Sequence, residues 1–185
     1  MRLFVASSFE PAFTAGLKAA AEYARIAAPK GAVKWVEPGN FHLTYAFLGE
    51  LGKDGAAAAK SGIEAGLAGL KPFTLAMGGF GVFPSARRPQ VLWVGIGEGA
   101  PQLRELAARL GAGLTAAGLK FENRFEPHIT IGRVKDSLPE SYLRRFADYA
   151  PPRRTVSRVA SVELMESVLT PEGPVYRQAV SCPLL

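Results

Sequence analysis

The chain contains only two histidines, and both occur in the same short pattern. One lies in the segment Phe41–Tyr45 (FHLTY) and the other in Pro127–Ile131 (PHITI), about half the chain length apart. Threonine is also scarce, so the chance that both histidines have Thr two residues later is of order one in a thousand. The repeated pattern predicts an internal duplication, in which two similar lobes bring their strands together around one cleft.

A spacing of two residues is typical of one face of a β-strand. Alternate side chains of a strand point to the same side, so His42 shares a face with Thr44, and His128 shares a face with Thr130. The intervening residues are apolar and are expected to bury the opposite faces: Phe41, Leu43, Tyr45 and Phe47 in the first strand, Ile129 and Ile131 in the second. Each strand should therefore present an imidazole and a hydroxyl toward the cleft.

Apolar periodicity and turn residues predict strands that alternate with Ala-rich helices along the chain. Strands are expected at residues 3–6, 33–36, 41–48, 73–83, 90–96, 128–134, 156–164 and 175–180. Helices are expected at residues 11–28, 53–70, 101–118 and 139–149. Because no linker or low-complexity stretch divides this pattern, residues 1–185 are expected to form one domain built from two lobes.

The composition limits the class of protein and its partners. The single Cys182 excludes a disulfide framework, and the net charge of +6 favours an anionic partner such as nucleic acid, although many basic proteins have no specific partner. No apolar run reaches the ~18 residues of a membrane span, and the N-terminus turns polar at Ser7, too early for a secretory signal. We expect a cytoplasmic monomer with no cofactor, no membrane association and no protein partner.

The two His-x-Thr strands have the groups that phosphodiester cleavage requires. One imidazole can act as base toward the nucleophile and the other as acid toward the leaving oxygen, because the reference pKa of His is about 6.5. The hydroxyls of Thr44 and Thr130 can donate to phosphate oxygens as charge develops. Arg133 offers a planar fork for phosphate, but in a straight strand it lies on the face of Ile129, so it reaches the cleft only if the strand ends or twists there.

Two other interpretations of the histidines are weaker. A histidine on a strand is often a structural residue, but this explanation requires the repeated pattern to be an accident. A metal site usually needs a third ligand, and the nearby carboxylates Glu37, Glu50 and Glu126 do not have the spacing of ligands. We therefore expect no metal.

Further side chains are candidates for contact with RNA. Lys34, Arg87, Arg88 and Arg124 could guide an RNA backbone, and Trp35 or Phe125 could stack on a base. Arg87 and Arg88 fit an ordinary solvated hairpin tip equally well, and Trp93, within the run Val91–Val94, is expected to lie in the core.

The two motifs, with their surroundings, resemble the 2H phosphoesterases, specifically the RNA 2′,3′-cyclic phosphodiesterases once called 2′-5′ RNA ligases. The resemblance rests on the segments 40–50 and 125–133 and is supported by 2–6, 83–84, 90–95, 163–167 and 173–176. It departs from the family at Phe41 and Tyr45, where Leu is frequent, and at Val168, where a basic residue is common. The third departure could weaken a phosphate or backbone contact.

This resemblance implies an α+β fold with pseudo-two-fold symmetry, in which two mainly antiparallel sheets surround a central cleft and helices lie outside. It implies metal-independent hydrolysis of an RNA or nucleoside 2′,3′-cyclic phosphate end to a 2′-phosphate. His42 would protonate the leaving 3′ oxygen and His128 would activate water, a division that the sequence itself does not distinguish. Thr44 and Thr130 would hold the phosphate oxygens.

Two alternative functions use the same cleft. A reversible 2′-5′ RNA ligase would run related chemistry in the opposite direction, and a non-catalytic module would bind RNA or nucleotides without turnover. The substrate is also open among tRNA fragments, small cyclic nucleotides, ADP-ribose cyclic phosphate and 2′-5′ oligonucleotides.

Overall fold

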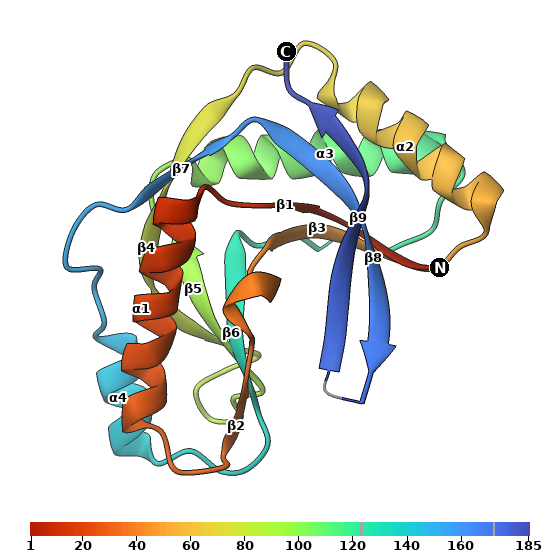
Figure 1. Cartoon of the computed structure of the whole chain (residues 1–185). Helices are drawn as coiled ribbons and strands as arrows, with labels where there is room; N and C mark the ends of the chain where they lie inside the picture. The colour runs from red at the N-terminus through yellow and green to blue at the C-terminus, as the bar shows by residue number, and fades with distance from the viewer. Residues whose placement is uncertain (123, 172) are drawn as a thin grey trace.

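Two antiparallel sheets make up the framework of the protein (Figure 1). The computed structural model describes residues 1–122, 124–171 and 173–185. One sheet has four strands in the order β3-β1-β8-β9, and the other has five in the order β2-β6-β5-β4-β7. The strands are β1 (Arg2–Ser7), β2 (Val33–Trp35), β3 (Leu43–Glu50), β4 (Phe73–Phe83), β5 (Val91–Ile96), β6 (His128–Val134), β7 (Val156–Val159), β8 (Ser161–Thr170) and β9 (Gly173–Pro183).

The helices lie on the outer faces of the two sheets. They are α1 (Pro11–Ala27), α2 (Lys53–Leu67), α3 (Ala100–Ala116) and α4 (Glu140–Ala147), with a short 3-10 turn η1 (Pro38–Asn40) before β3. Helices α1 and α4 cover the five-stranded sheet, whereas α2 and α3 cover the four-stranded sheet (Figure 1). Among the described residues, no helix combines the length and the hydropathy needed to cross a membrane.

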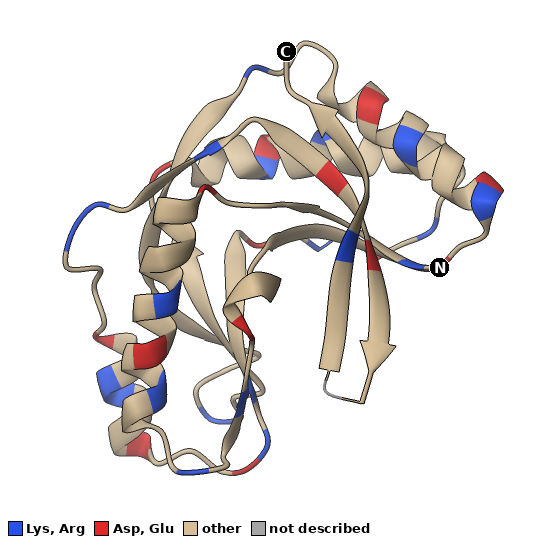
Figure 2. Ribbon diagram, viewed as in Figure 1, with Lys and Arg blue, Asp and Glu red and all other residues tan. Residues whose placement is uncertain are grey.

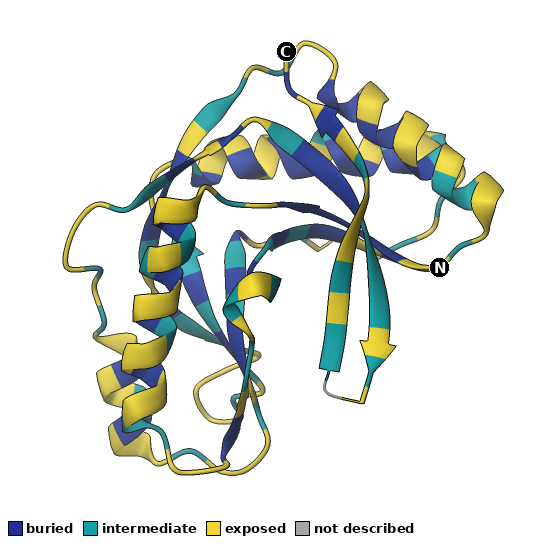
Figure 3. Ribbon diagram, in the orientation of Figure 1, coloured by how far each residue is buried: buried dark blue, intermediate teal, exposed yellow. Residues whose placement is uncertain are grey.

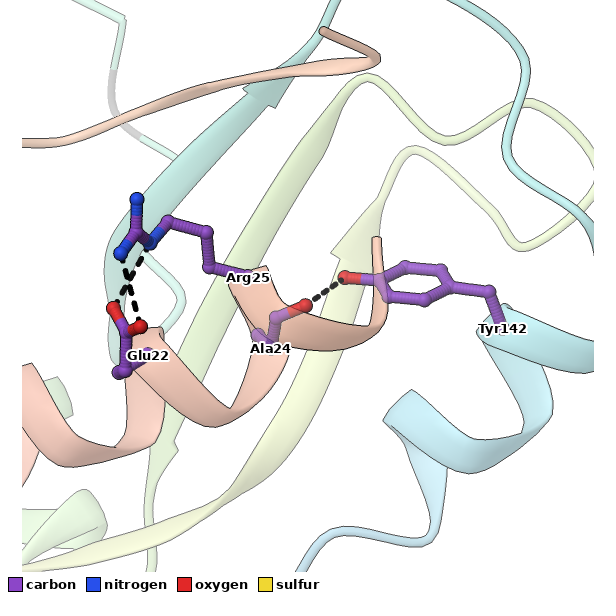
Figure 4. A network of polar contacts seen from close by, with 4 residues as sticks. All are labelled: Glu22, Ala24, Arg25 and Tyr142. Atoms are coloured by element: carbon purple, nitrogen blue, oxygen red, sulfur yellow. Dashed lines mark hydrogen bonds and ion pairs between the residues drawn. The ribbon is translucent and has the colours of Figure 1, made fainter. Parts of the chain in front are cut away.

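Each helix buries one face in the core and leaves the other exposed (Figure 3). In α1 the stripe is made of residues at helical spacing, namely Phe13, Leu17, Ala20 and Ala24. The Tyr142 hydroxyl of α4 donates to the Ala24 carbonyl oxygen over 3.2 Å, which joins the two helices of this lobe (Figure 4). Arg25 and Glu22 form an ion pair on the exposed side of α1, with Nε and Oε2 2.9 Å apart.

Glycines allow the two helices of the other lobe to approach closely. A Cβ atom at Gly62 of α2 would lie 2.9 Å from the Gly113 carbonyl oxygen of α3, and one at Gly66 would lie 2.9 Å from the Arg109 carbonyl oxygen. The absence of side chains at these positions therefore sets the distance between the helix backbones.

The strand orders of the two sheets correspond to each other. The order β3-β1-β8-β9 corresponds to β6-β5-β4-β7 in the other sheet, and β2 is an additional edge strand beside β6. In both halves the strand beside the histidine strand, β1 or β5, is followed by a helix, and so is the histidine strand itself. The expected α+β fold with two antiparallel sheets and outer helices is thus observed.

One predicted strand is wrong in its extent. Residues 156–164 were expected to form a single strand, but the chain breaks at Ala160 into β7 and β8, which belong to different sheets. Val159 and Val162, on either side of the break, are both buried in the same hydrophobic core. The apolar run is continuous in the sequence because the chain passes from one sheet to the other without leaving the core.

Candidate active site

A cleft of about 790 Å³ is lined by residues of both sheets. His42 and Thr44 reach it from the β3 side, while His128 and Thr130 reach it from β6. The four side chains of the two repeated motifs are thus brought together in one cavity, although half the chain separates them.

Both imidazole rings are held by the same local hydrogen bond. Nδ1 of His42 lies 2.6 Å from the carbonyl oxygen of Asn40, and Nδ1 of His128 lies 2.7 Å from that of Glu126, in each case two residues upstream. A carbonyl oxygen only accepts, so each Nδ1 carries the proton and donates it. The Nε2 atom of each ring is therefore the one available for proton exchange with a ligand.

Asn40, whose carbonyl oxygen accepts the hydrogen bond of His42, is itself bound to the last strand of the chain, β9. The Asn40 side-chain amide donates to the Pro174 carbonyl oxygen of β9 over 2.9 Å. The hairpin of β8 and β9 therefore supports the residue that orients His42.

Aromatic rings pack against both imidazoles. The His42 ring centroid lies 5.0 Å from those of Phe4 and Tyr176, with the Tyr176 ring nearly perpendicular at 87°. The His128 centroid lies 5.0 Å from that of Phe83, at 90°, and 6.3 Å from that of Trp93. These contacts and the Nδ1 hydrogen bonds leave each ring little freedom to rotate.

Burial dominates the protonation of both histidines. It lowers the pKa of His42, opposed by the hydrogen bond to Asn40 and reinforced by the charge of His128. It also lowers the pKa of His128, opposed by Glu126 and reinforced by the charge of Arg133. In the free protein both rings are therefore predominantly neutral at pH 7.

A β-bulge follows the first motif and changes which residues face the cleft. Ala6 pairs with Thr44 and Val5 pairs with Ala46, so Tyr45 is an extra residue in β3. Tyr45 and Ala46 are consequently both buried, and Phe47 turns to the opposite side with 65% of its surface exposed. The prediction that Phe47 lies on the buried face is wrong, because strict alternation ends at the bulge.

A second bulge lies at the equivalent position of β6. Trp93 pairs with Thr130 and Leu92 pairs with Gly132, so Ile131 is the extra residue. The phase of the strand then shifts, and Arg133 joins the face of His128 and Thr130 and lines the cleft. The bulge is the departure from a straight strand that this arginine required.

Gly132 is needed for this second bulge to pack. A Cβ atom on Gly132 would lie 2.6 Å from Cγ1 of Val33 on the neighbouring strand β2. Ala46 occupies the corresponding place after the first bulge. A small residue two positions after each motif threonine is thus a weak sequence signal of the bulges, which a strict period of two does not predict.

The remaining predicted contacts are distributed unevenly. Lys34, Trp35, Arg124 and Phe125 line the cleft, whereas Arg87 and Arg88 are exposed in the loop between β4 and β5 and do not line it. The Phe125 ring stacks on Tyr45, with centroids 5.5 Å apart, so one of its faces is covered by the protein. Trp93, expected in the core, is half-buried under His128.

The lining residues that the sequence does not single out as site residues include Asn40, Phe83, Lys135 and Tyr176. Their position depends on contacts far along the chain, as in the pairing of His42 with Tyr176. No local motif signals such contacts.

Of the carboxylates considered as metal ligands, Glu37 and Glu126 line the cleft and Glu50 does not. Glu50 is at the far end of β3, where its Oε2 is 3.6 Å from the N-terminal amine, and Glu126 pairs with Arg104 at 2.7 Å. Within the part of the chain that the structure describes, no group of three or more His, Cys, Asp or Glu side chains is arranged to hold a metal ion.

Comparison with known proteins identifies the family. The model of the 2′-5′ RNA ligase superfamily matches residues 9–168. The chain belongs to this superfamily. Among its members, an RNA 2′,3′-cyclic phosphodiesterase of Aeropyrum pernix is 36% identical over 150 residues, covering 78% of this chain and 82% of the relative. Another, from Archaeoglobus fulgidus, is 32% identical over 179 residues, covering 96% and 97%.

Solved structures of the superfamily share the fold. A Thermus thermophilus protein aligns with a TM-score of 0.78 and 30% identity, covering 100% of this chain and 98% of that one. E. coli LigT in complex with 3′-AMP aligns with a TM-score of 0.78 and 25% identity, covering 99% and 97%.

Proposed function

We propose that the protein hydrolyses 2′,3′-cyclic phosphate ends of RNA to 2′-phosphates, with His42 as acid and His128 as base and without a metal ion. One observation carries the proposal: two imidazoles with equivalent Nδ1 hydrogen bonds, which leave Nε2 free for proton exchange, line one cleft together with two threonines and an arginine. The relatives named RNA 2′,3′-cyclic phosphodiesterase support the same reaction.

The proposed reaction is a single displacement at phosphorus. Nε2 of His128 takes a proton from water as the water oxygen forms a bond to phosphorus. The bond from phosphorus to the 3′ oxygen breaks, and Nε2 of His42 gives its proton to that oxygen. The products are a 3′-hydroxyl and a 2′-phosphate, and exchange with solvent returns both imidazoles to their starting protonation states.

The phosphate of the bound substrate favours the protonated form of His42 that its role as acid requires. His42 must be protonated on both nitrogens to act as acid, yet burial lowers its pKa in the free protein. An anionic phosphate within a few ångströms stabilises the imidazolium and raises this pKa. Substrate binding therefore prepares the acid, while the cation of Arg133 helps to keep His128 neutral.

The non-bridging oxygens are assigned to the remaining cleft groups. The hydroxyls of Thr44 and Thr130 donate to them from the two sides of the cleft, and the Arg133 guanidinium binds them through its planar N–H groups. These donors stabilise the negative charge that grows on phosphorus oxygens as water attacks.

The test is a substrate panel with product analysis. The purified protein is incubated with 2′,3′-cyclic and 3′,5′-cyclic nucleotides and with an RNA oligonucleotide that ends in a 2′,3′-cyclic phosphate. We expect 2′-phosphate products from the 2′,3′-cyclic substrates only, at a rate unchanged by EDTA. A 3′-phosphate product, or loss of turnover with EDTA, would contradict the proposal.

Adding a 5′-hydroxyl RNA and a binding measurement to this panel separates the alternative functions. Joining of the cyclic-phosphate RNA to a 5′-hydroxyl RNA in preference to hydrolysis would indicate a ligase. Binding of the cyclic nucleotide with no product over hours would indicate a binding module.

A further inference from the structure

A row of cations continues from the active site along β6. The bulge at Ile131 places Arg133 on the cleft face, and the alternation that follows places Lys135 on the same face. Lys34 of β2 pairs directly with Arg133 across the antiparallel ladder and lines the same cleft. The β6 face thus runs from His128 and Thr130 into three basic side chains.

These three cations are not neutralised by the protein. Within residues 1–122, 124–171 and 173–185, Lys34, Arg133 and Lys135 are in none of the ion pairs, whereas nearby Arg104 and Arg124 each pair with a glutamate. Cβ atoms of directly opposite residues lie about 4.5–5.5 Å apart, and like charges there destabilise a sheet. An anion bound between Lys34 and Arg133 would remove this repulsion.

The acidic residues of the cleft do not compensate this row. Glu122 pairs with Arg124 and Glu126 pairs with Arg104. Glu37, which follows β2, also lines the cleft, but among the described residues it forms no ion pair with Lys34, Arg133 or Lys135, and it is one carboxylate against three cations. The wall formed by β2 and β6 is therefore locally positive, as the basic segments at this end of the lobe indicate (Figure 2).

The row leads toward a second basic element. The Val134 amide donates to the Gln90 carbonyl oxygen over 2.9 Å, which attaches the end of β6 to the loop that contains Arg87 and Arg88. Arg87 and Arg88 are exposed cations in this adjoining loop.

We propose that the wall formed by β2 and β6 binds the phosphates of the nucleotides upstream of the cyclic phosphate, so that an RNA strand is bound in preference to a mononucleotide. This inference rests on the proposed function. A cyclic phosphate ends the strand, so every further phosphate lies on its 5′ side and must leave the active site in one direction. Same-face residues of a strand are about 6.6 Å apart, close to the separation of successive phosphates in an extended RNA strand.

The experiment compares adenosine 2′,3′-cyclic phosphate, its 5′-phosphorylated form and an RNA hexamer that ends in the same cyclic nucleotide. For the wild type we expect a KM at least tenfold lower for the hexamer, with a difference that shrinks as salt is raised. The Lys135→Gln variant should raise the hexamer KM about threefold to fivefold. It should also reduce the slope of log KM against log salt by about 0.7, the value of one phosphate contact on a single strand.

Two controls make the comparison specific. Lys135→Gln should leave the kinetics of the cyclic mononucleotide within twofold of wild type, because Lys135 lies one same-face step, about 6.6 Å, beyond Arg133, which is assigned to the reacting phosphate. Lys71→Gln removes the same charge from an exposed site outside the cleft and should change neither substrate.

Several results would overturn the inference. Equal KM values for hexamer and mononucleotide, equal effects of Lys135→Gln on both, or the full gain from the 5′-phosphate alone would each exclude an RNA path. If the wild type turns over no substrate, the proposed function fails, and anisotropy of a labelled hexamer with a 3′-phosphate end still tests the path through the same variants and salt series.

Discussion

Strands β3 and β6 have the same local structure around their histidines, and they differ in the residue that faces the cleft after the bulge. Each presents a histidine and a threonine to the cleft, orients the imidazole on the carbonyl two residues upstream, and bulges one residue after the threonine. After the bulge, however, the cleft-facing residue is Phe47 in β3 and Arg133 in β6. The histidine and threonine that both strands share fit a reaction with two proton transfers, which needs two similar groups. The difference between Phe47 and Arg133 makes the β6 side of the cleft basic and the β3 side apolar.

The largest effect is expected for the two histidines that β3 and β6 have in common. His42→Ala and His128→Ala should each lower kcat on a 2′,3′-cyclic nucleotide by about 10²- to 10⁴-fold, the contribution of one general acid or base. Circular dichroism and thermal unfolding should stay close to wild type, because both rings lie at the cleft surface and outside the packed cores. Turnover that persists in the purified double variant would break the comparison.

The next effect concerns the residue that differs. Arg133→Gln should reduce kcat/KM on the cyclic mononucleotide by about 10- to 100-fold, because a charge-assisted hydrogen bond to phosphate is lost. Phe47→Leu, at the equivalent position of β3, should change kcat by less than about threefold, since it has no charge to offer. Equal losses of activity on the cyclic mononucleotide in the two variants would mean that Arg133 contributes no more to the reaction than Phe47 does.

A smaller effect is expected for the threonines. Thr44→Val and Thr130→Val keep the β-branched shape but remove one donor each, so each should lower kcat about tenfold. Steady-state kinetics of the two variants and of the pair measure this. A pair that is no slower than either single variant would mean that only one hydroxyl reaches the phosphate.

The pH dependence gives the subtlest comparison. The productive free enzyme needs protonated His42 and neutral His128, and burial lowers the pKa of both below 6.5. As pH rises through the lowered pKa of His42, the acid is lost, so the alkaline limb of kcat/KM should lie below pH 6.5. In kcat this limb should move to higher pH, because the bound phosphate raises the pKa. Profiles that are flat from pH 5 to 9 would contradict this assignment.

The sequence predicts what depends on local periodicity. A period of two places His42 with Thr44 and His128 with Thr130, and the repeat of the pattern predicts two lobes around a cleft. The bulges at Tyr45 and Ile131 depend on how a strand pairs with its neighbour, so the orientation of Phe47 is predicted wrongly and that of Arg133 is left conditional.

Local periodicity does not predict which residues pair or pack when they lie far apart in the sequence. The break at Ala160 arises because the chain passes from one sheet to the other. The apolar periodicity of the sequence does not indicate this change of sheet. The packing of Tyr176 on His42 likewise joins residues at opposite ends of the chain. Such contacts follow from the assembled fold and have no local signature.

The division of proton transfers between the two imidazoles is tested most directly with a cyclic nucleotide in which sulfur replaces the 3′ oxygen. A thiolate leaves without protonation, so this substrate removes the need for the acid and keeps the need for the base. We predict that the sulfur substrate restores turnover of His42→Ala to near the wild-type rate, while His128→Ala stays slow. Equal restoration of both variants, or of His128→Ala alone, would contradict the assignment.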